Sequence, residues 1–200
     1  MKIVLASGNA GKLRELAAML APLGHEVLSQ SAFGIETPPE TGVTFVENAL
    51  LKARYTAGRT SLPSLADDSG IEVDALAGRP GVYSARYAGE GATDQQNLEK
   101  MLDELRGVPS ERRTARYQCV IVLARSADDP DPLIAQGTWE GRILTTPRGS
   151  GGFGYDPIFQ PEGLTLTAAE LPATEKNARS HRGQALRALT EKLRGPATSR

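Results

Sequence analysis

Cysteine is almost absent from this sequence, since Cys119 is the only one among 200 residues. A single cysteine excludes an intrachain disulfide scaffold and an all-cysteine zinc site. The chain also lacks an apolar run of about 18 residues, which a membrane-spanning helix needs. Neither sign of charge dominates, because 23 Lys and Arg residues face 24 Asp and Glu residues. A net charge of −1 provides no overall basic field, so we expect neither a nucleic acid nor a membrane as a partner.

Several catalytic signatures are missing as well. His25 and His181 are the only two histidines, which is too few for a three-histidine metal site. No Gly-x-Gly-x-x-Gly fingerprint follows the first apolar run, and this disfavours an oxidoreductase. Nothing in the sequence indicates a serine or thiol nucleophile. The first apolar run, residues 3–6, is too short for the apolar region of a signal peptide, so we expect a cytoplasmic protein.

The residues that are present indicate a globular α/β protein. Apolar residues make up 40% of the chain and charged residues 24%, a balance typical of folded domains. Apolar runs predict strands at 3–6, 26–29, 64–66, 71–75, 115–125 and 133–143. Helical spacing and N-cap residues predict helices at 13–20, 44–58, 93–105 and 182–193. Because both kinds of element alternate along the chain, we expect an α/β fold in a single domain, residues 1–195, and a disordered tail at 196–200.

The segment from Ser7 to Lys12 is the first candidate site. It follows a predicted strand, turns through Gly8, Asn9, Ala10 and Gly11, and places Lys12 in the first turn of a helix. Free N–H groups and the helix dipole favour an anion at such a place. The glycine spacing is not that of a Walker A loop. Taken alone, the segment is better explained by an ordinary strand-to-helix turn with a solvated lysine.

Asp67 and Asp68 form the second candidate, because two adjacent acids end an apolar run. If the strand continues through them, their side chains point to opposite faces, so one can serve a ligand while the other pairs elsewhere. A carboxylate there suits Mg²⁺, which prefers oxygen ligands and keeps waters or substrate phosphates. The alternative is an acidic turn between two strands.

Other polar and aromatic residues gather in three further segments. Asn48 and Lys52 lie four apart and share one face of a predicted helix, whose capping box pairs Thr44 with Glu47. The run 151–157 places aromatic residues among glycines, which suits either packing on a flat base or covering the core. His181 and Arg182 precede a helix and offer donors for an anion or a carbonyl oxygen.

Six segments together resemble one family, the inosine/xanthosine triphosphate pyrophosphatases. They are ASGNAGKLRE at 6–15, ETGVTFVENA at 40–49 followed by Lys52, ADDSG at 66–70, GVYSARYAG at 81–89, GFGYDPIF at 152–159 and SHRGQAL at 180–186. They stand in the family's order and span residues 3 to about 193. Each segment is a weak signal alone, whereas six in order are specific.

The resemblance implies a long mixed central sheet flanked by helices, two lobes around a substrate cleft, and a homodimer. It implies Mg²⁺-dependent hydrolysis of deaminated purine nucleoside triphosphates (ITP, dITP, XTP and dXTP) to the monophosphate and pyrophosphate. Asp68 is then the general base and a metal ligand, with Glu40 as a second metal ligand. The substrate-binding residues implied by match are Ser7, Gly8, Asn9, Ala10, Gly11, Lys12, Lys52, Ser69, Phe153, Gly154, Tyr155, Asp156, Lys176, His181 and Arg182.

Two rival functions remain open from the sequence. A related pyrophosphatase could prefer modified pyrimidines or 7-methylguanosine triphosphate, and its substrate profile would reveal that preference. A regulatory protein could bind nucleotides through the same loops without releasing pyrophosphate, which leaves Asp68 without a catalytic task.

Overall fold

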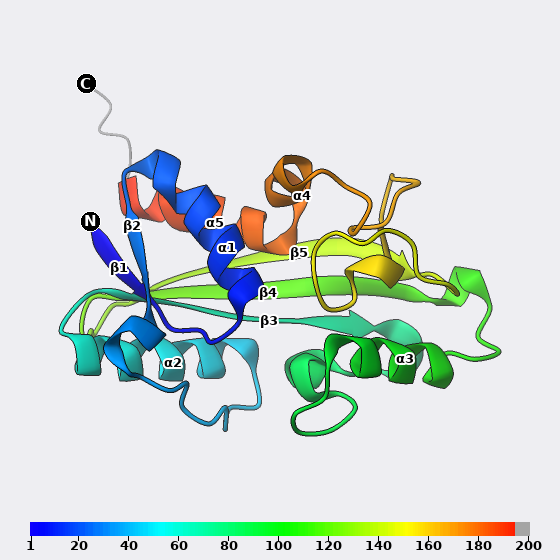
Figure 1. The fold of residues 1–200 in the computed structure, drawn as a ribbon, viewed down its shortest axis with the longest axis horizontal. Helices are drawn as coiled ribbons and strands as arrows, with labels where there is room; N and C mark the ends of the chain where they lie inside the picture. Colours follow the sequence, from blue (N-terminus) through cyan, green and yellow to red (C-terminus); the bar gives the residue numbers. More distant parts are fainter. Residues whose placement is uncertain (195–200) are drawn as a thin grey trace. The chain divides into compact units, whose positions relative to one another are not determined.

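A computed structural model describes residues 1–194, which contain a six-stranded sheet in the order β2-β1-β3-β4-β5-β6. The strands are β1 (Lys2–Leu5), β2 (Glu26–Ser29), β3 (Ser64–Val73), β4 (Thr114–Ala124), β5 (Leu133–Ile143) and β6 (Phe159–Pro161). Strand β1 pairs in parallel with β2 and β3, whereas β5 and β6 are antiparallel (Figure 1). The sheet is therefore mixed, and the predicted α/β class is confirmed.

The α-helices are α1 (Ala10–Leu20), α2 (Phe45–Thr60), α3 (Asp94–Glu104), α4 (Ala173–Arg179) and α5 (His181–Arg194). The predicted capping box opens α2, because the Thr44 side chain accepts from the Glu47 N–H while Glu47 accepts from the Thr44 N–H. Thr93 opens α3 with the same reciprocal pattern, as the sequence indicates. Both helices thus begin where their caps predict.

Four elements differ from the sequence expectations. Strand β3 runs without a break from Ser64 to Val73, so the alternative of an acidic turn at Asp67 and Asp68 is wrong. Ala75, predicted to continue a strand, lies in a short 3₁₀-helix. The strand β6 and the helix α4 were not predicted at all. Helix α4 begins after Pro172 without a side-chain cap, and β6 has only three residues, so neither carries a strong local signal.

The chain divides into two compact units that interleave along the sequence. Unit 1 comprises residues 1–68, 119–137 and those from 182 onward, and unit 2 comprises residues 69–118 and 138–181. The predicted cleft between lobes stays a prediction, and the predicted tail at 196–200 lies outside the described residues.

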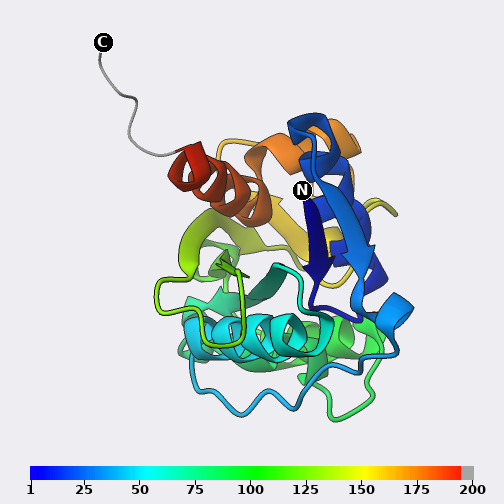
Figure 2. The same ribbon diagram turned by 90° about the vertical axis from the view of Figure 1, so that its left-hand side faces the viewer.

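In unit 1, helices cover both faces of the strands (Figures 1 and 2). Residues of α1 and α5 pack on one face, where Leu16 and Leu189 are buried with Ile3, Leu5 and Ile121. Residues of α2 pack on the other face, where Ala49 and Ala53 contact a cluster that includes Ala6, Ala66 and Val122. Because successive residues of a strand face opposite sides, β3 contributes Leu65 to the first cluster and Ala66 to the second.

Unit 2 has its own apolar core. Leu98, Met101 and Leu105, on or just after α3, are buried against residues of the strands, among them Ile71, Tyr117, Trp139 and Phe159. Within residues 1–194, no helix combines the length and the apolar character that crossing a membrane requires.

Candidate functional site

The loop between β1 and α1 is capped by Asn9. The Asn9 side-chain oxygen accepts from the N–H groups of Gly11 and Lys12, at 2.8 and 3.0 Å. Ser7 braces the same loop, since its hydroxyl oxygen accepts from the N–H of Asn9 at 3.1 Å. The loop is therefore held in a fixed conformation at the carboxyl end of β1, with Lys12 in the first turn of the helix. Open α/β sheets bind ligands at this end of their strands.

Asp67 lies next to this loop and is fully buried. Its carboxylate forms an ion pair with Lys12 at 2.5 Å and accepts from the Arg182 Nε at 2.8 Å. The Cys119 thiol donates to it at 3.0 Å. Burial raises the pKa of Asp67, but the charges of Arg182 and Lys12 outweigh burial and hold it well below the ordinary value. Asp67 is thus a permanently ionised anchor for two cations.

Asp68, the next residue along β3, has different partners, as the alternation along a strand predicts. Its Oδ1 accepts from the Lys52 Nζ at 2.6 Å, and Lys52 also donates to Glu40 Oε1 at 2.7 Å. The buried Asp68 Oδ2 has no hydrogen-bond partner within residues 1–194. Burial raises the pKa of Asp68 to about 6, although Lys52 and Lys12 oppose this rise. These three side chains, Glu40, Lys52 and Asp68, are called the Asp68 cluster below.

Helix α2 positions two members of the Asp68 cluster. Lys52 and Asn48 lie one turn apart on its buried face, as their spacing predicts. The Asn48 Oδ1 accepts from the N–H of Gly42 at 2.8 Å and so holds the segment that carries Glu40. A Cβ atom at Gly42 would approach both Asn48 Oδ1 and Glu47 to 2.7 Å, so only glycine fits without displacement. Glu40, in which the sequence shows no local signal, is thereby brought to Lys52.

In unit 2, Asp156 organises the second glycine-rich segment. Its Oδ2 accepts from the Lys176 Nζ at 2.7 Å and from the N–H of Phe153 at 2.9 Å. The Lys176 ammonium also lies 5.1 Å from the centre of the Phe153 ring. A Cβ atom at Gly152, whose φ is +72°, would lie 2.0 Å from Asp156 Oδ2. The turn therefore requires glycine, and it closes around a buried lysine–aspartate pair.

Tyr117 also contacts Asp156, and nothing in the sequence identified it as a candidate site residue. Its hydroxyl donates to Asp156 Oδ1 at 3.3 Å. Its ring stacks on the imidazole of His181, with centres 4.6 Å apart and planes 7° apart. Below, the Asp156 cluster means Tyr117, Phe153, Asp156, Lys176 and His181. A tyrosine within a predicted strand is ordinarily a core residue, so no sequence pattern identified Tyr117 as a site residue.

The other predicted site residues have varied surroundings. Tyr155 is buried and donates to the carbonyl of Ser84 at 2.8 Å, and burial raises the pKa of its hydroxyl. The N–H of Gly154 donates to Asp94 at 2.8 Å. Arg182 is only 1% exposed and is held by Asp67 and by Glu15. Glu15 lies within the first resembling segment, but no rule of spacing connects it with Arg182.

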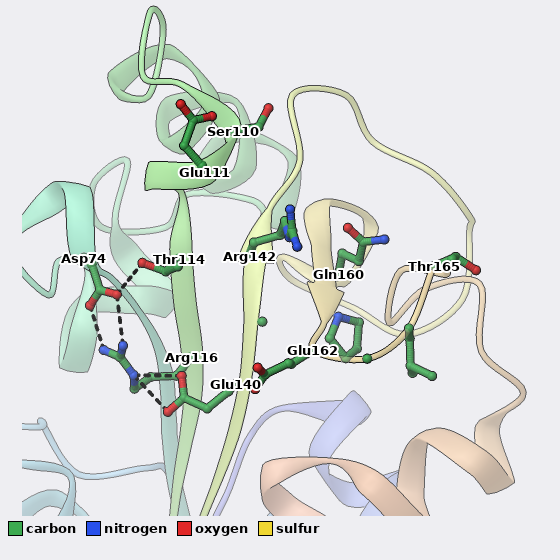
Figure 3. A pocket seen from close by; sticks show the side chains of 14 residues that line it. Asp74, Ser110, Glu111, Thr114, Arg116, Glu140, Arg142, Gln160, Glu162 and Thr165 are labelled. Carbon is green, nitrogen blue, oxygen red and sulfur yellow. Dashed lines mark hydrogen bonds and ion pairs between the residues drawn. The ribbon is translucent and has the colours of Figure 1, made fainter.

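Unit 2 also has a surface hollow of about 870 Å³ that none of the predicted site residues lines. Figure 3 shows Arg116 in this hollow between Asp74 and Glu140, with Arg142 and Gln160 nearby. Arg116 forms ion pairs with Asp74 at 2.9 Å and Glu140 at 3.1 Å, so one cation is shared between two carboxylates. These two carboxylate side chains are 46% and 50% exposed, whereas Asp67 and Asp68 are buried.

The parallel strands, with charged side chains beside the carboxyl end of β1, define an α/β protein of the kind that binds ligands at that end. The chain belongs to the Ham1 family, whose model matches residues 3–192. It is 60% identical to a dITP/XTP pyrophosphatase of Thioalkalivibrio sulfidiphilus, over 98% of this chain and all of that protein. A Shigella flexneri protein of the same name is 56% identical over 96% of this chain and 98% of its own length.

Solved structures show the same fold. A HAM1 protein from Coxiella burnetii superimposes with a TM-score of 0.88 at 49% identity, covering 97% of this chain and 98% of that one. The Ham1 protein of Staphylococcus aureus gives a TM-score of 0.85 at 39% identity, covering 98% and 100%. The predicted family resemblance is confirmed.

Proposed function

We propose that this protein hydrolyses deaminated purine nucleoside triphosphates, ITP, dITP, XTP and dXTP, to the nucleoside monophosphate and pyrophosphate. The names of relatives that are 56–60% identical over nearly the whole chain support this activity. The observation that carries the proposal is Asp68, a buried carboxylate whose pKa is about 6 and whose Oδ2 has no hydrogen-bond partner within residues 1–194. A carboxylate with a pKa near the working pH is suited to general base catalysis.

In this proposal, the Asp68 carboxylate accepts a proton from the water that attacks the α-phosphorus. Lys52 orients the carboxylate through Oδ1 and places a positive charge beside the developing negative charge. The segment from Ser7 to Lys12 holds the triphosphate, with Lys12 neutralising part of its charge. Ser69 follows Asp68 on β3 and contacts the phosphates or the ribose. No covalent intermediate is needed, which fits the missing nucleophile.

We propose Mg²⁺ as the cofactor, with Asp68 and Glu40 as its protein ligands. The donor set fits, because both groups are carboxylates, both accept from Lys52, and Asp68 Oδ2 is buried without a hydrogen bond within residues 1–194. Among the same residues, no group of three or more His, Cys, Asp or Glu side chains could hold a metal alone. Water and substrate phosphates would complete the shell, as is common for Mg²⁺. When bound, the metal neutralises phosphate charge.

We assign the purine base to the segment from Phe153 to Asp156, with Lys176, His181 and Arg182. An aromatic ring and a buried lysine–aspartate pair supply stacking and hydrogen bonds of both polarities. The expected homodimer and the cytoplasmic location remain predictions, and sedimentation velocity would test the first.

The test is pyrophosphate release, with and without Mg²⁺, from ITP, dITP, XTP, the four standard dNTPs and 7-methylguanosine triphosphate. We expect efficient release from the three deaminated nucleotides only, and loss of it in EDTA. A preference for 7-methylguanosine triphosphate or a modified pyrimidine would favour the related enzyme class. Binding of ITP without pyrophosphate release would favour a regulatory protein.

A further inference from the structure

Tyr117 joins two side chains to which the proposed function assigns the base. It lies on β4, is only 7% exposed, and belongs to unit 2, as do both of its partners. The stack on His181 is close to parallel, at 7°, with 4.6 Å between the ring centres. The tyrosine hydroxyl reaches Asp156 on the same side of the unit. One buried aromatic residue thus contacts both a histidine and a carboxylate.

Tyr117 is itself held firmly. Phe159 packs edge-on against it, with the ring centres 4.7 Å apart and the planes at 66°. Phe159 is fully buried and also packs on Trp139, at 5.5 Å. Because interiors are densely packed and χ angles occupy discrete wells, a buried ring held on its edge by the fully buried Phe159 has one orientation.

A fixed tyrosine ring fixes the plane of the histidine that stacks on it. His181 is the first residue of α5, where the helix sets its backbone but not its χ2 angle. The χ2 torsion of histidine is broad, so the imidazole plane needs a neighbour to define it. The direction of the ring N–H groups follows from that plane. A hydrogen bond to a purine edge depends on this direction, because such bonds weaken steeply when they bend.

We propose that Tyr117 is a positioning residue that sets the imidazole plane of His181 and thereby the selectivity between purine bases. The inference rests on the proposed function only for the identity of the substrate. The ring carries the effect, whereas the hydroxyl adds little. Its bond to Asp156 is long, at 3.3 Å, and Asp156 also accepts from Lys176 and from the Phe153 N–H.

The first test is the proton NMR spectrum of the full-length protein, which contains only two histidines. Because the two rings are nearly parallel with centres 4.6 Å apart, we expect the ring current of Tyr117 to shield the carbon-bound protons of His181, so that they resonate upfield of those of His25. The variant His25→Gln assigns the two sets of signals. Tyr117→Phe should keep the His181 signals upfield, and Tyr117→Leu should move them downfield. His181 signals at ordinary positions in the unchanged protein would overturn the proposal without any variant that might misfold.

The second test is the ratio of kcat/KM for ITP to that for ATP. In Tyr117→Leu this ratio should fall roughly two- to twelvefold, the loss that an aromatic contact typically carries. In Tyr117→Phe it should stay within about twofold, because a hydrogen bond as long as 3.3 Å is weak. ATP should be affected less, since its 6-amino group does not use the oriented donor.

Trp139→Leu is the matched control, because Trp139 is as buried as Tyr117 and packs on the same Phe159 ring. It should lower the Tm as Tyr117→Leu does, yet leave the His181 signals and the ITP to ATP ratio unchanged. An equal fall of the ratio in both variants would overturn the positioning role. If the unchanged protein releases no pyrophosphate from ITP, the proposed function fails, and the NMR test still decides the orientation.

Discussion

Replacing Asp68 by asparagine should abolish most of the activity and at the same time stabilise the protein at neutral pH. The substitution keeps the size of the side chain and keeps an oxygen acceptor for Lys52, but it removes the ionisable group. Loss of a general base typically lowers kcat by about 10²–10⁴-fold, and a weakened metal site adds to that loss.

The gain in stability follows from the direction of the pKa change. The pKa of Asp68 rises from 3.8 to about 6, chiefly because burial disfavours its charged form. The folded protein therefore holds the Asp68 proton more tightly than the unfolded chain does. Below pH 4 the group is protonated in both states, whereas above pH 6 its ionisation costs the folded state free energy. The gap between 3.8 and about 6 corresponds to roughly 3 kcal/mol at pH 7 and above. This figure already includes the attraction of Lys52.

The measurement is urea unfolding in EDTA at pH values from 4 to 8, for the unchanged protein and for Asp68→Asn. The difference in unfolding free energy should be near zero at pH 4 and should grow to about 3 kcal/mol in favour of the variant by pH 8. Asp74→Asn is the control, because it should change the unfolding free energy at neutral pH in the opposite direction and lower the stability. A hydrogen bond from Arg116 lowers the pKa of Asp74, so its ionised form stabilises the fold above about pH 4 and that stability is lost at lower pH.

An Asp68→Asn variant that is less stable at pH 8, or a difference independent of pH, would refute the electrostatic reasoning. Turnover within threefold of the unchanged protein would remove Asp68 from the mechanism. The two readouts are independent, so either part of the prediction can fail alone.

Lys12→Ala should raise the KM for ITP and lower kcat, since a lost contact with a charged group costs roughly 1.5–3 kcal/mol. Unchanged kinetic constants would mean that the segment from Ser7 to Lys12 is an ordinary turn that does not bind phosphate. Gly152→Ala should reduce ITP turnover by displacing Asp156, since the new Cβ would lie 2.0 Å from its carboxylate, and normal kinetics with a normal Tm would contradict this. Arg182→Ala should lower the unfolding free energy by about 3–5 kcal/mol, because it leaves buried Asp67 with fewer cations, and urea titration measures it. Arg182→Lys should recover part of that stability, and a fully stable Arg182→Ala protein would refute the anchoring role.

Local signals predicted the elements that depend on neighbours in sequence. The capping box of Thr44 and Glu47 is such a signal, and α2 begins where it predicts. The apolar run ending at Ala66 predicted the start of β3 but not its full length. Helix α4 was missed because Pro172 gives it no side-chain cap. Local rules describe contacts within one turn or one strand, so they fail where contacts with distant segments determine whether a helix or strand forms.

The site was predicted unevenly for the same reason. The family resemblance predicted Asp68, Glu40 and Lys52 as site residues. The residues around Glu40 alone could not show that it lies close to the other two. The bond between Arg182 and Asp67 spans 115 residues, and no spacing rule reaches that far. Tyr117 was overlooked because a tyrosine within a strand is ordinarily a core residue, so its polar and stacking partners could be seen only in three dimensions.

The register of β3 explains why two adjacent aspartates differ so much. Strand β1 pairs with β3 so that Leu5 faces Leu65, and the chain continues from there to Asp67 and Asp68. Because side chains alternate, Asp67 turns toward Lys12 and Arg182 and stays ionised, whereas Asp68 turns toward Lys52 and keeps a raised pKa. A slip of one residue would turn Asp68 away from Lys52 and toward the face on which Lys12 and Arg182 lie. The parallel pairing of β1 and β3 therefore sets the chemistry of the site as well as the fold.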